Sequence, residues 1–207
     1  MCDGFAPELR RVTGTRRFSQ AISEGDGISV LVQVDDLTGA RSAEEQGAEA
    51  LVLRGRVDGI GEATSLPLLW RPSASPAEAS AAGADACVLA IRDADDGDDL
   101  ERLNREALEL GLDCVVEVRD DEELELALER IDPEIFLLTG LGGDEAETPL
   151  ERALDLLPDV PAGKLAVAEV GRARREDVAE LERAGVDAVI VGTGNVAELV
   201  GGPPPEV

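Results

Sequence analysis

Two glutamates are the strongest candidates for chemistry in this chain. Glu117 and Glu169 lie at the ends of the apolar runs CVVEV and LAVAEV. In each run the glutamate has the alternation expected of a side chain that points into a closed sheet. A carboxylate at the edge of an apolar core is a candidate catalytic or ligand-binding group. The alternative is a structural network in which the glutamates pair with Arg71 or Arg119, and the residues leave both options open.

Arginines and glycines near other run ends would suit an anion. Arg54, Arg71 and Arg119 each follow an apolar run, so they would carry positive charge at the same edge as the glutamates. The last two runs lead into Gly171 and Gly192-Thr193-Gly194, whose backbone N–H groups would suit a phosphate. A plain tight turn is the alternative for these glycines. The pattern predicts a small phosphorylated or anionic ligand and no cofactor.

Eight apolar runs would position these residues. Most are continuous rather than alternating, which is typical of parallel strands covered on both faces. The predicted strands are Ile28–Val34, Ala50–Leu53, Leu66–Trp70, Ala86–Ile91, Asp113–Val118, Glu134–Thr139, Lys164–Ala168 and Asp187–Val191. Helical patterns in the gaps include Asp99–Leu112, Asp120–Ile131, Pro149–Leu157 and Arg175–Ala184.

A repeated unit supports winding of strand, helix and strand. SAAGADACVLAI (Ser80–Ile91) and LERAGVDAVIVG (Leu181–Gly192) share a helix end, a glycine turn, an aspartate and a strand. We therefore predict an α/β fold: one compact (β/α)8 TIM barrel with a short N-terminal helix. Residues 1–27 would close the barrel bottom, 28–200 would form the barrel and 201–207 a disordered tail. An open doubly wound sheet is the alternative, but no GxGxxG follows the first strand.

Composition excludes several classes of partner. A net charge of −26 over 207 residues disfavours nucleic acid and anionic membranes. No apolar run is long enough to span a membrane, and the N-terminus lacks the apolar region of a signal peptide, so we expect a cytoplasmic protein. Cys87 and Cys114 lie in apolar runs and are expected to be buried free thiols, while the absence of histidine argues against a metal site.

The chain has few groups that could donate a proton near neutral pH. Lys164 is its only lysine, at the start of a predicted strand, and it has no histidine or tyrosine. A general acid at the strand ends would therefore have to be a carboxyl group, because arginine holds its proton too firmly.

Three segments resemble the indole-3-glycerol-phosphate synthase family of tryptophan biosynthesis. They are FSQAISEGDGISVLVQV (Phe18–Val34), LGLDCVVEVRDDEELELAL (Leu110–Leu128) and LAVAEVGRARREDVAELERAGVDAVIVG (Leu165–Gly192). The resemblance implies a decarboxylating lyase that closes an indole ring on a carboxyphenylamino-deoxyribulose phosphate. It places the strand 5 and strand 7 glutamates of the family on Glu117 and Glu169, and its phosphate-binding glycines on Gly171 and Gly192.

Other family positions are substituted. The family's strand 1 reads Glu-Ile-Lys, its strand 3 carries a lysine within Arg-Lys-Asp-Phe, its strand 6 an asparagine, and a serine follows its strand 7 glutamate. Here strand 1 has Gln33-Val34-Asp35, and the strand 3 lysine is replaced by Arg71, which Pro72 follows. The strand 6 asparagine is replaced by Leu138 or Thr139, and the serine by Val170. The loop after strand 1, which helps to cover the substrate in the family, is reduced to a few residues around Leu37–Ala40.

Three functions follow from these observations. The first is a divergent synthase that still closes the indole ring and depends on both glutamates. The second is an impaired or repurposed barrel, a pseudoenzyme whose arginines and glycines bind a phosphorylated or anionic ligand. The third is a non-catalytic interaction subunit with a tryptophan-pathway protein as its partner.

Overall fold

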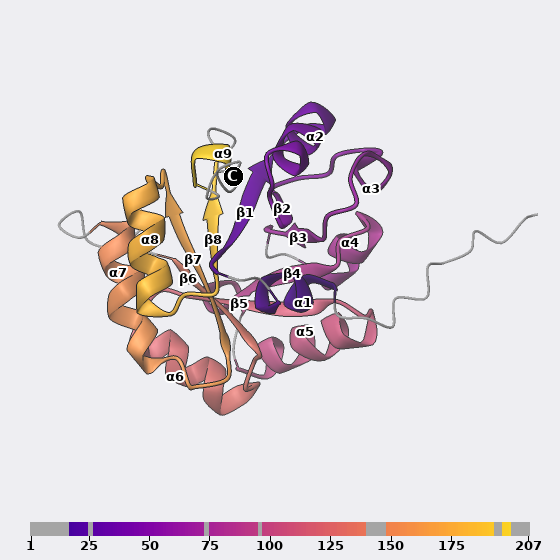
Figure 1. The fold of residues 1–207 in the computed structure, drawn as a ribbon. Helices are drawn as coiled ribbons and strands as arrows, with labels where there is room; N and C mark the ends of the chain where they lie inside the picture. Colours follow the sequence, from indigo (N-terminus) through magenta and orange to yellow (C-terminus); the bar gives the residue numbers. More distant parts are fainter. Residues whose placement is uncertain are drawn as a thin grey trace, which may run out of the picture.

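The computed structural model describes residues 17–24, 27–72, 75–94, 97–139, 148–192 and 196–199. Eight parallel strands follow one another in chain order and close into a barrel (Figure 1). They are β1 (Ser29–Val34), β2 (Ala50–Leu53), β3 (Leu68–Trp70), β4 (Ala86–Ala90), β5 (Asp113–Val118), β6 (Ile135–Thr139), β7 (Leu165–Gly171) and β8 (Ala188–Val191). The predicted single (β/α)8 barrel is confirmed.

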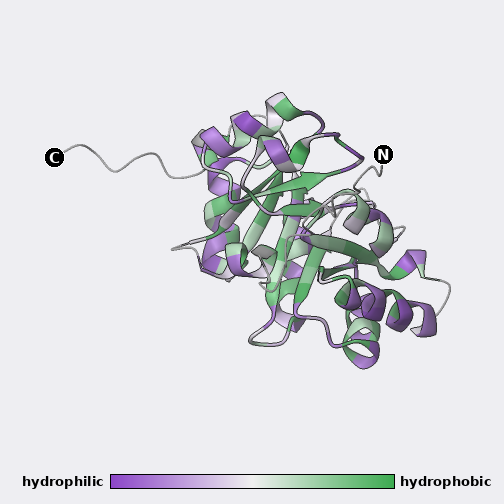
Figure 2. Cartoon of the chain, turned by 90° about the vertical axis from the view of Figure 1, so that its right-hand side faces the viewer, coloured by the Kyte–Doolittle hydropathy of each residue, from purple (hydrophilic) through white to green (hydrophobic). Residues whose placement is uncertain are grey.

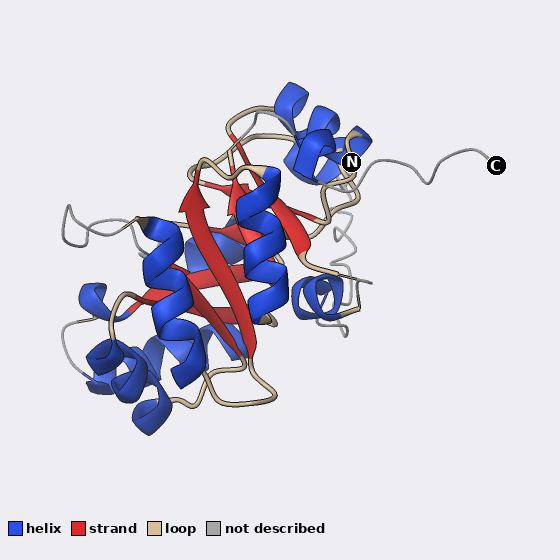
Figure 3. Ribbon diagram, turned by 60° about the vertical axis from the view of Figure 1, so that its left-hand side comes forward, coloured by secondary structure: helices blue, strands red, loops and turns tan. Residues whose placement is uncertain are grey.

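A helix follows each strand and covers the outside of the barrel (Figure 3). These helices are α2 (Leu37–Glu45), α3 (Ile60–Ala63), α4 (Pro76–Ala81), α5 (Gly97–Glu109), α6 (Asp121–Arg130), α7 (Pro149–Leu156), α8 (Arg175–Ala184) and α9 (Val196–Leu199). Short 3-10 turns η1 (Ile91–Asp93) and η2 (Leu157–Asp159) extend β4 and α7. In Figure 2 the strands are largely hydrophobic, whereas the helices carry many hydrophilic residues.

The strands separate two apolar clusters. Alternate side chains such as Leu31, Val52 and Val115 fill the barrel interior, and the residues between them pack under the helices. The N-terminal helix α1 (Arg17–Ser23) contributes Phe18 and Ile22 to the interior cluster. These side chains close the bottom of the barrel. We therefore expect an active site at the mouth, where the carboxyl ends of the strands lie.

The register of β3 decides which side chain reaches the mouth. Trp70 pairs with Leu53 of β2 and belongs to the helix-facing cluster. Its indole N–H is buried and has no hydrogen-bond partner among the residues that the structure describes. The backbone N–H of the next residue, Arg71, donates to the carbonyl of Leu53 at 2.8 Å, which continues the pairing by one residue. Arg71 therefore points inward, as the alternation predicts.

The aspartates of the repeated unit connect neighbouring strands. Asp85 accepts a hydrogen bond from the backbone N–H of Leu68 at 3.0 Å, and Asp187 accepts one from Ala166 at 2.7 Å. In both copies the preceding turn contains a glycine in the left-handed region, with a φ of 78° at Gly83 and 100° at Gly185. Each aspartate thus satisfies a backbone donor at the start of an adjacent strand.

We expect Asp187→Asn to be at least as stable as the wild type at pH 7. Burial raises the pKa of the Asp187 carboxyl, against the opposing effect of its backbone hydrogen bonds. A folded-state pKa above the unfolded one contributes stability only at acidic pH, and this is lost as pH rises through the folded pKa. Asparagine keeps an acceptor oxygen without the buried charge, whereas Asp187→Ala should cost about 1–3 kcal/mol. Urea unfolding at pH 7 and pH 4 measures both effects, and an Asn variant as unstable as the Ala variant would contradict them.

Two free thiols are buried in the folded barrel. Cys87 and Cys114 are buried free cysteines, as predicted, and they are register partners on β4 and β5. Burial raises the pKa of the Cys87 thiol to about 12 and that of Cys114 still further above its ordinary value. Because the thiolate is the reactive form, we expect neither to be alkylated by iodoacetamide at pH 7.5 until urea is added. Peptide mass spectrometry measures this, and rapid alkylation of either one in the native protein would refute it.

Candidate active site at the barrel mouth

Arg71 lies at the centre of the mouth and joins the two predicted glutamates. Its Nη1 donates to Glu117 Oε2 at 2.8 Å, and its Nη2 donates to Glu169 Oε2 at 2.8 Å. The side chains of Glu117 and Glu169 are 2% and 3% exposed. The inward alternation of β3, β5 and β7 therefore brings together three predicted site residues that are distant in the sequence.

Two further arginines bind the remaining carboxylate oxygens. Arg54 Nη2 donates to Glu169 Oε1 at 2.9 Å, and Arg92 Nη1 donates to Glu117 Oε1 at 2.6 Å. The five residues form a continuous series of alternating charge, Arg54–Glu169–Arg71–Glu117–Arg92, which we call the ion-pair chain. Its formal charge is +1, from three arginines and two glutamates.

The ion-pair chain is buried at its centre and exposed at its ends. The Arg71 side chain is 14% exposed, whereas those of Arg54 and Arg92 are 49% and 38% exposed. Burial by itself would lower the pKa of the Arg71 guanidinium, but attraction to Glu169 and Glu117 outweighs burial and raises the pKa. Arg71 is therefore a permanent cation at the centre of the mouth.

Three members of the mouth were not among the predicted site residues. Arg92 follows β4 in the turn η1, and its position after an apolar run is the same signal that marked Arg54 and Arg71. Gln33 of β1 accepts a hydrogen bond from Arg54 Nε at 2.7 Å. Thr139 of β6 is buried and is the register partner of Glu169. Thr139, rather than Leu138, therefore lies on the inward face.

The remaining predicted ligand-binding residues are not brought into the ion-pair chain. Arg119 hydrogen-bonds Glu123 on α6 through its backbone and its guanidinium. Gly171 and Gly192 are exposed, and a φ of 73° explains why glycine is required at Gly171. Thr193 and Gly194 lie outside the described residues. The predicted structural pairing of each glutamate is thus realised through Arg71 and not through Arg119.

The segment after β1 leaves this side of the mouth without a long covering loop. The loop predicted around Leu37–Ala40 is the first turn of α2, and only Asp35 and Asp36 separate that helix from the strand. Asp36 caps the helix by accepting a hydrogen bond from the backbone N–H of Gly39 at 2.7 Å. Because α2 is capped at Asp36, two residues after β1 ends, the helix begins where a longer loop would otherwise lie.

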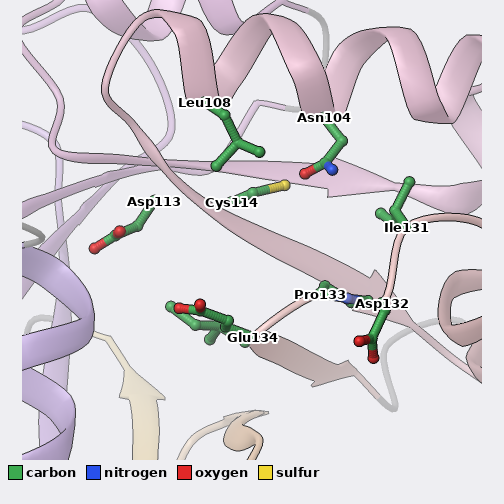
Figure 4. A pocket seen from close by; sticks show the side chains of 9 residues that line it. Asn104, Leu108, Asp113, Cys114, Ile131, Asp132, Pro133 and Glu134 are labelled. Carbon is green, nitrogen blue, oxygen red and sulfur yellow. The ribbon is translucent and has the colours of Figure 1, made fainter.

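A pocket of about 130 Å³ lies at the other end of the barrel, between α5 and the turn before β6 (Figure 4). Leu108 and Cys114 contribute to its lining. Its carboxylates already have partners: Asp113 accepts a backbone hydrogen bond from α1, and Asp132 pairs with Lys164 at 2.7 Å. These pairs are structural, so we place the candidate site at the mouth.

The described part of the chain offers no cluster of three or more residues suited to hold a metal ion. Within the same ranges, every helix is too short or too polar to cross a membrane.

A sequence profile of the family described as indole-3-glycerol phosphate synthase matches residues 75–198. The chain belongs to this family. The matched segment contains Glu117, Glu169 and Arg92, whereas Arg54 and Arg71 precede it. The match therefore covers both predicted site glutamates, and the ion-pair chain connects them to arginines on both sides of the boundary of the match.

Solved structures of other barrels are similar in fold. The N-acetylmannosamine-6-phosphate 2-epimerase of Clostridium perfringens is 15% identical, with a TM-score of 0.64 over 82% of this chain and 87% of that one. A thiamine phosphate pyrophosphorylase of Pyrococcus furiosus is 18% identical, with a TM-score of 0.63 over 83% and 90% of the two chains. At these identities the likeness shows the barrel fold alone, so function within the synthase family has to be argued from the mouth.

Proposed function

We propose that this member of the indole-3-glycerol phosphate synthase family no longer closes the indole ring and binds a small phosphorylated or anionic molecule at its mouth. One observation carries the proposal: all four carboxylate oxygens of Glu117 and Glu169 accept hydrogen bonds from guanidinium groups. Each of these oxygens thus has a charged donor with which a substrate would have to compete for the carboxylate.

Among the residues that the structure describes, no lysine replaces those of the family at the mouth. Lys164 is the only lysine and lies at the bottom of the barrel, where its Nζ is 2.7 Å from Asp132 Oδ1. The position of the family's strand 3 lysine is occupied by Arg71, which does not release its proton near neutral pH. Gln33 stands where the family has a strand 1 glutamate, and it accepts a hydrogen bond from Arg54 instead.

The same residues favour binding of an anion. The ion-pair chain carries an excess of one positive charge in a protein whose net charge is −26. Its exposed ends, Arg54 and Arg92, offer guanidinium donors that suit carboxylate or phosphate oxygens. Because Asp93 lies 3.8 Å from Arg92 Nε, the Arg54 end is where an anion meets a guanidinium group that pairs with a single carboxylate, that of Glu169.

Calorimetric titration of the full chain tests this proposal. Inorganic phosphate and the family substrate, carboxyphenylamino-deoxyribulose phosphate, would each be titrated into the wild type and into Arg54→Gln. We expect saturable binding that weakens in the variant, with Arg119→Gln as the matched control that binds like the wild type. Absence of binding by both anions, or equal weakening in the control, would contradict the proposal.

A further inference from the structure

Two cysteines lie side by side near the bottom of the barrel. Cys87 is the second residue of β4 and Cys114 the second residue of β5, and the two are register partners in the parallel sheet. Both side chains belong to the helix-facing cluster, so they extend from the same face of adjacent strands. They form a pair of thiols at the opposite end of the barrel from the ion-pair chain, and the proposed function does not use them.

The spacing of this pair suits a disulfide bond. Neighbouring strands lie about 4.8 Å apart, and the Cα atoms of bridged cysteines are usually about 4.4–6.8 Å apart. The acid–base chemistry also reflects their proximity: burial raises the pKa of the Cys114 thiol, and a negative charge on Cys87 raises that pKa further. A bond between the two sulfur atoms would therefore join β4 to β5 without a change of register.

Burial decides when these thiols react. In the folded barrel Cys87 is 1% and Cys114 is 9% exposed, and α5 packs over this part of the sheet, with Asn104 and Leu108 beside Cys114 (Figure 4). The thiolate is the reactive form, and it is scarce here because burial raises the pKa of Cys87 to about 12. In the unfolded chain both thiols are exposed and have ordinary pKa values. A bridge would therefore form while the chain folds and not afterwards.

We propose that Cys87 and Cys114 are a modification site: they form a disulfide when the chain folds in the presence of a low-molecular-weight disulfide such as oxidised glutathione. One cysteine thiolate attacks the S–S bond of the reagent and displaces one glutathione thiolate, which leaves a mixed disulfide on the protein. The other cysteine thiolate attacks that mixed disulfide and displaces the second glutathione. Two protein thiols are oxidised, one oxidised glutathione is reduced to two thiols, and the two thiol protons pass to the departing thiolates.

The bridge has a consequence for stability. It closes a loop of residues 87–114, which contains α5, and it restricts the unfolded chain. The oxidised barrel should therefore melt on the order of 5–10 °C above the reduced one. Since the same burial excludes reductants from the sulfur atoms, the redox state that the chain acquires during folding should persist in the native protein.

Refolding in a glutathione buffer tests the proposal. The reduced full chain, unfolded in urea, is diluted at pH 8 into reduced and oxidised glutathione, and free thiols are blocked with iodoacetamide before peptide mass spectrometry without reduction. We expect a peptide pair linked through Cys87 and Cys114, a native circular dichroism spectrum and the higher melting temperature. Folded, reduced protein kept in the same buffer should retain both thiols, and its bridging at the same rate would refute the dependence on folding.

Two variants complete the test. Cys2→Ser removes the third cysteine, which lies outside the described residues, and it should bridge as the wild type does. Cys87→Ala leaves Cys114 without its partner, so its melting temperature should be the same after refolding with or without oxidised glutathione. Native protein in which Cys87 and Cys114 are free after oxidative refolding, or are linked only to glutathione or Cys2, would overturn the proposal. A bridged barrel that melts no higher than the reduced one would also overturn it.

Discussion

Replacing Arg71 with methionine should lower the free energy of unfolding by about 3–5 kcal/mol. The substitution removes one partner from each of two glutamates that are almost fully buried. Burial of a charge without a partner is the expensive part, and methionine fills much of the volume without supplying a donor. Glu117 keeps Arg92 and Glu169 keeps Arg54, which favours the lower end of the range. Urea unfolding at pH 7 measures the loss.

The triple variant Arg71→Met, Glu117→Leu, Glu169→Leu is the informative control. It removes the buried charges together, so it should recover most of the stability that the single substitution loses. Arg119→Met is the matched surface control, because Arg119 pairs with Glu123 outside the ion-pair chain, and it should cost no more than about 1 kcal/mol. If Arg71→Met costs no more than Arg119→Met, Arg71 is not the buried centre that we describe.

Ring closure by the wild type should be slower than in the synthase family by a factor of about 10⁴ or more. Loss of one general acid or base costs about 10²–10⁴ in rate. The resemblance places three replaced family groups at Gln33, Asp35 and Arg71, and every carboxylate oxygen of Glu117 and Glu169 has a guanidinium partner. Single substitution of Arg71 by lysine should not restore the rate, because the lysine would still lie between two carboxylates.

Much of the barrel is predictable from the pattern of apolar runs. The observed β2 and β5 have the predicted bounds, and α8 begins and ends as expected. The ends of other elements depend on individual backbone conformations. The pattern continues α5 to Leu112, but the helix ends at Glu109, and Gly111 takes a left-handed φ of 75° before β5. The alternation of side chains determined which residues face inward, because one face of each strand must be buried.

The sequence predicts which residues lie at the mouth better than it predicts which arginine pairs with which glutamate. Alternation predicts that Glu117, Glu169 and Arg71 share the interior, and the structure brings them into contact. Arginine side chains are long, so the strand end on which an arginine lies does not decide which carboxylate it reaches. Arg119 is one turn from Glu123 and pairs locally, whereas Arg92 crosses to Glu117 on the next strand. The spacing of residues along the sequence does not distinguish these two outcomes.

Indole fluorescence during incubation with the family substrate is the most direct test of the central claim, that the ion-pair chain has replaced ring-closing chemistry. The account predicts no rise in fluorescence above that of a protein-free control, while calorimetry on the same sample detects binding. Steady indole formation that is abolished by Glu117→Gln, and retained in the matched variant Glu123→Gln, would contradict it.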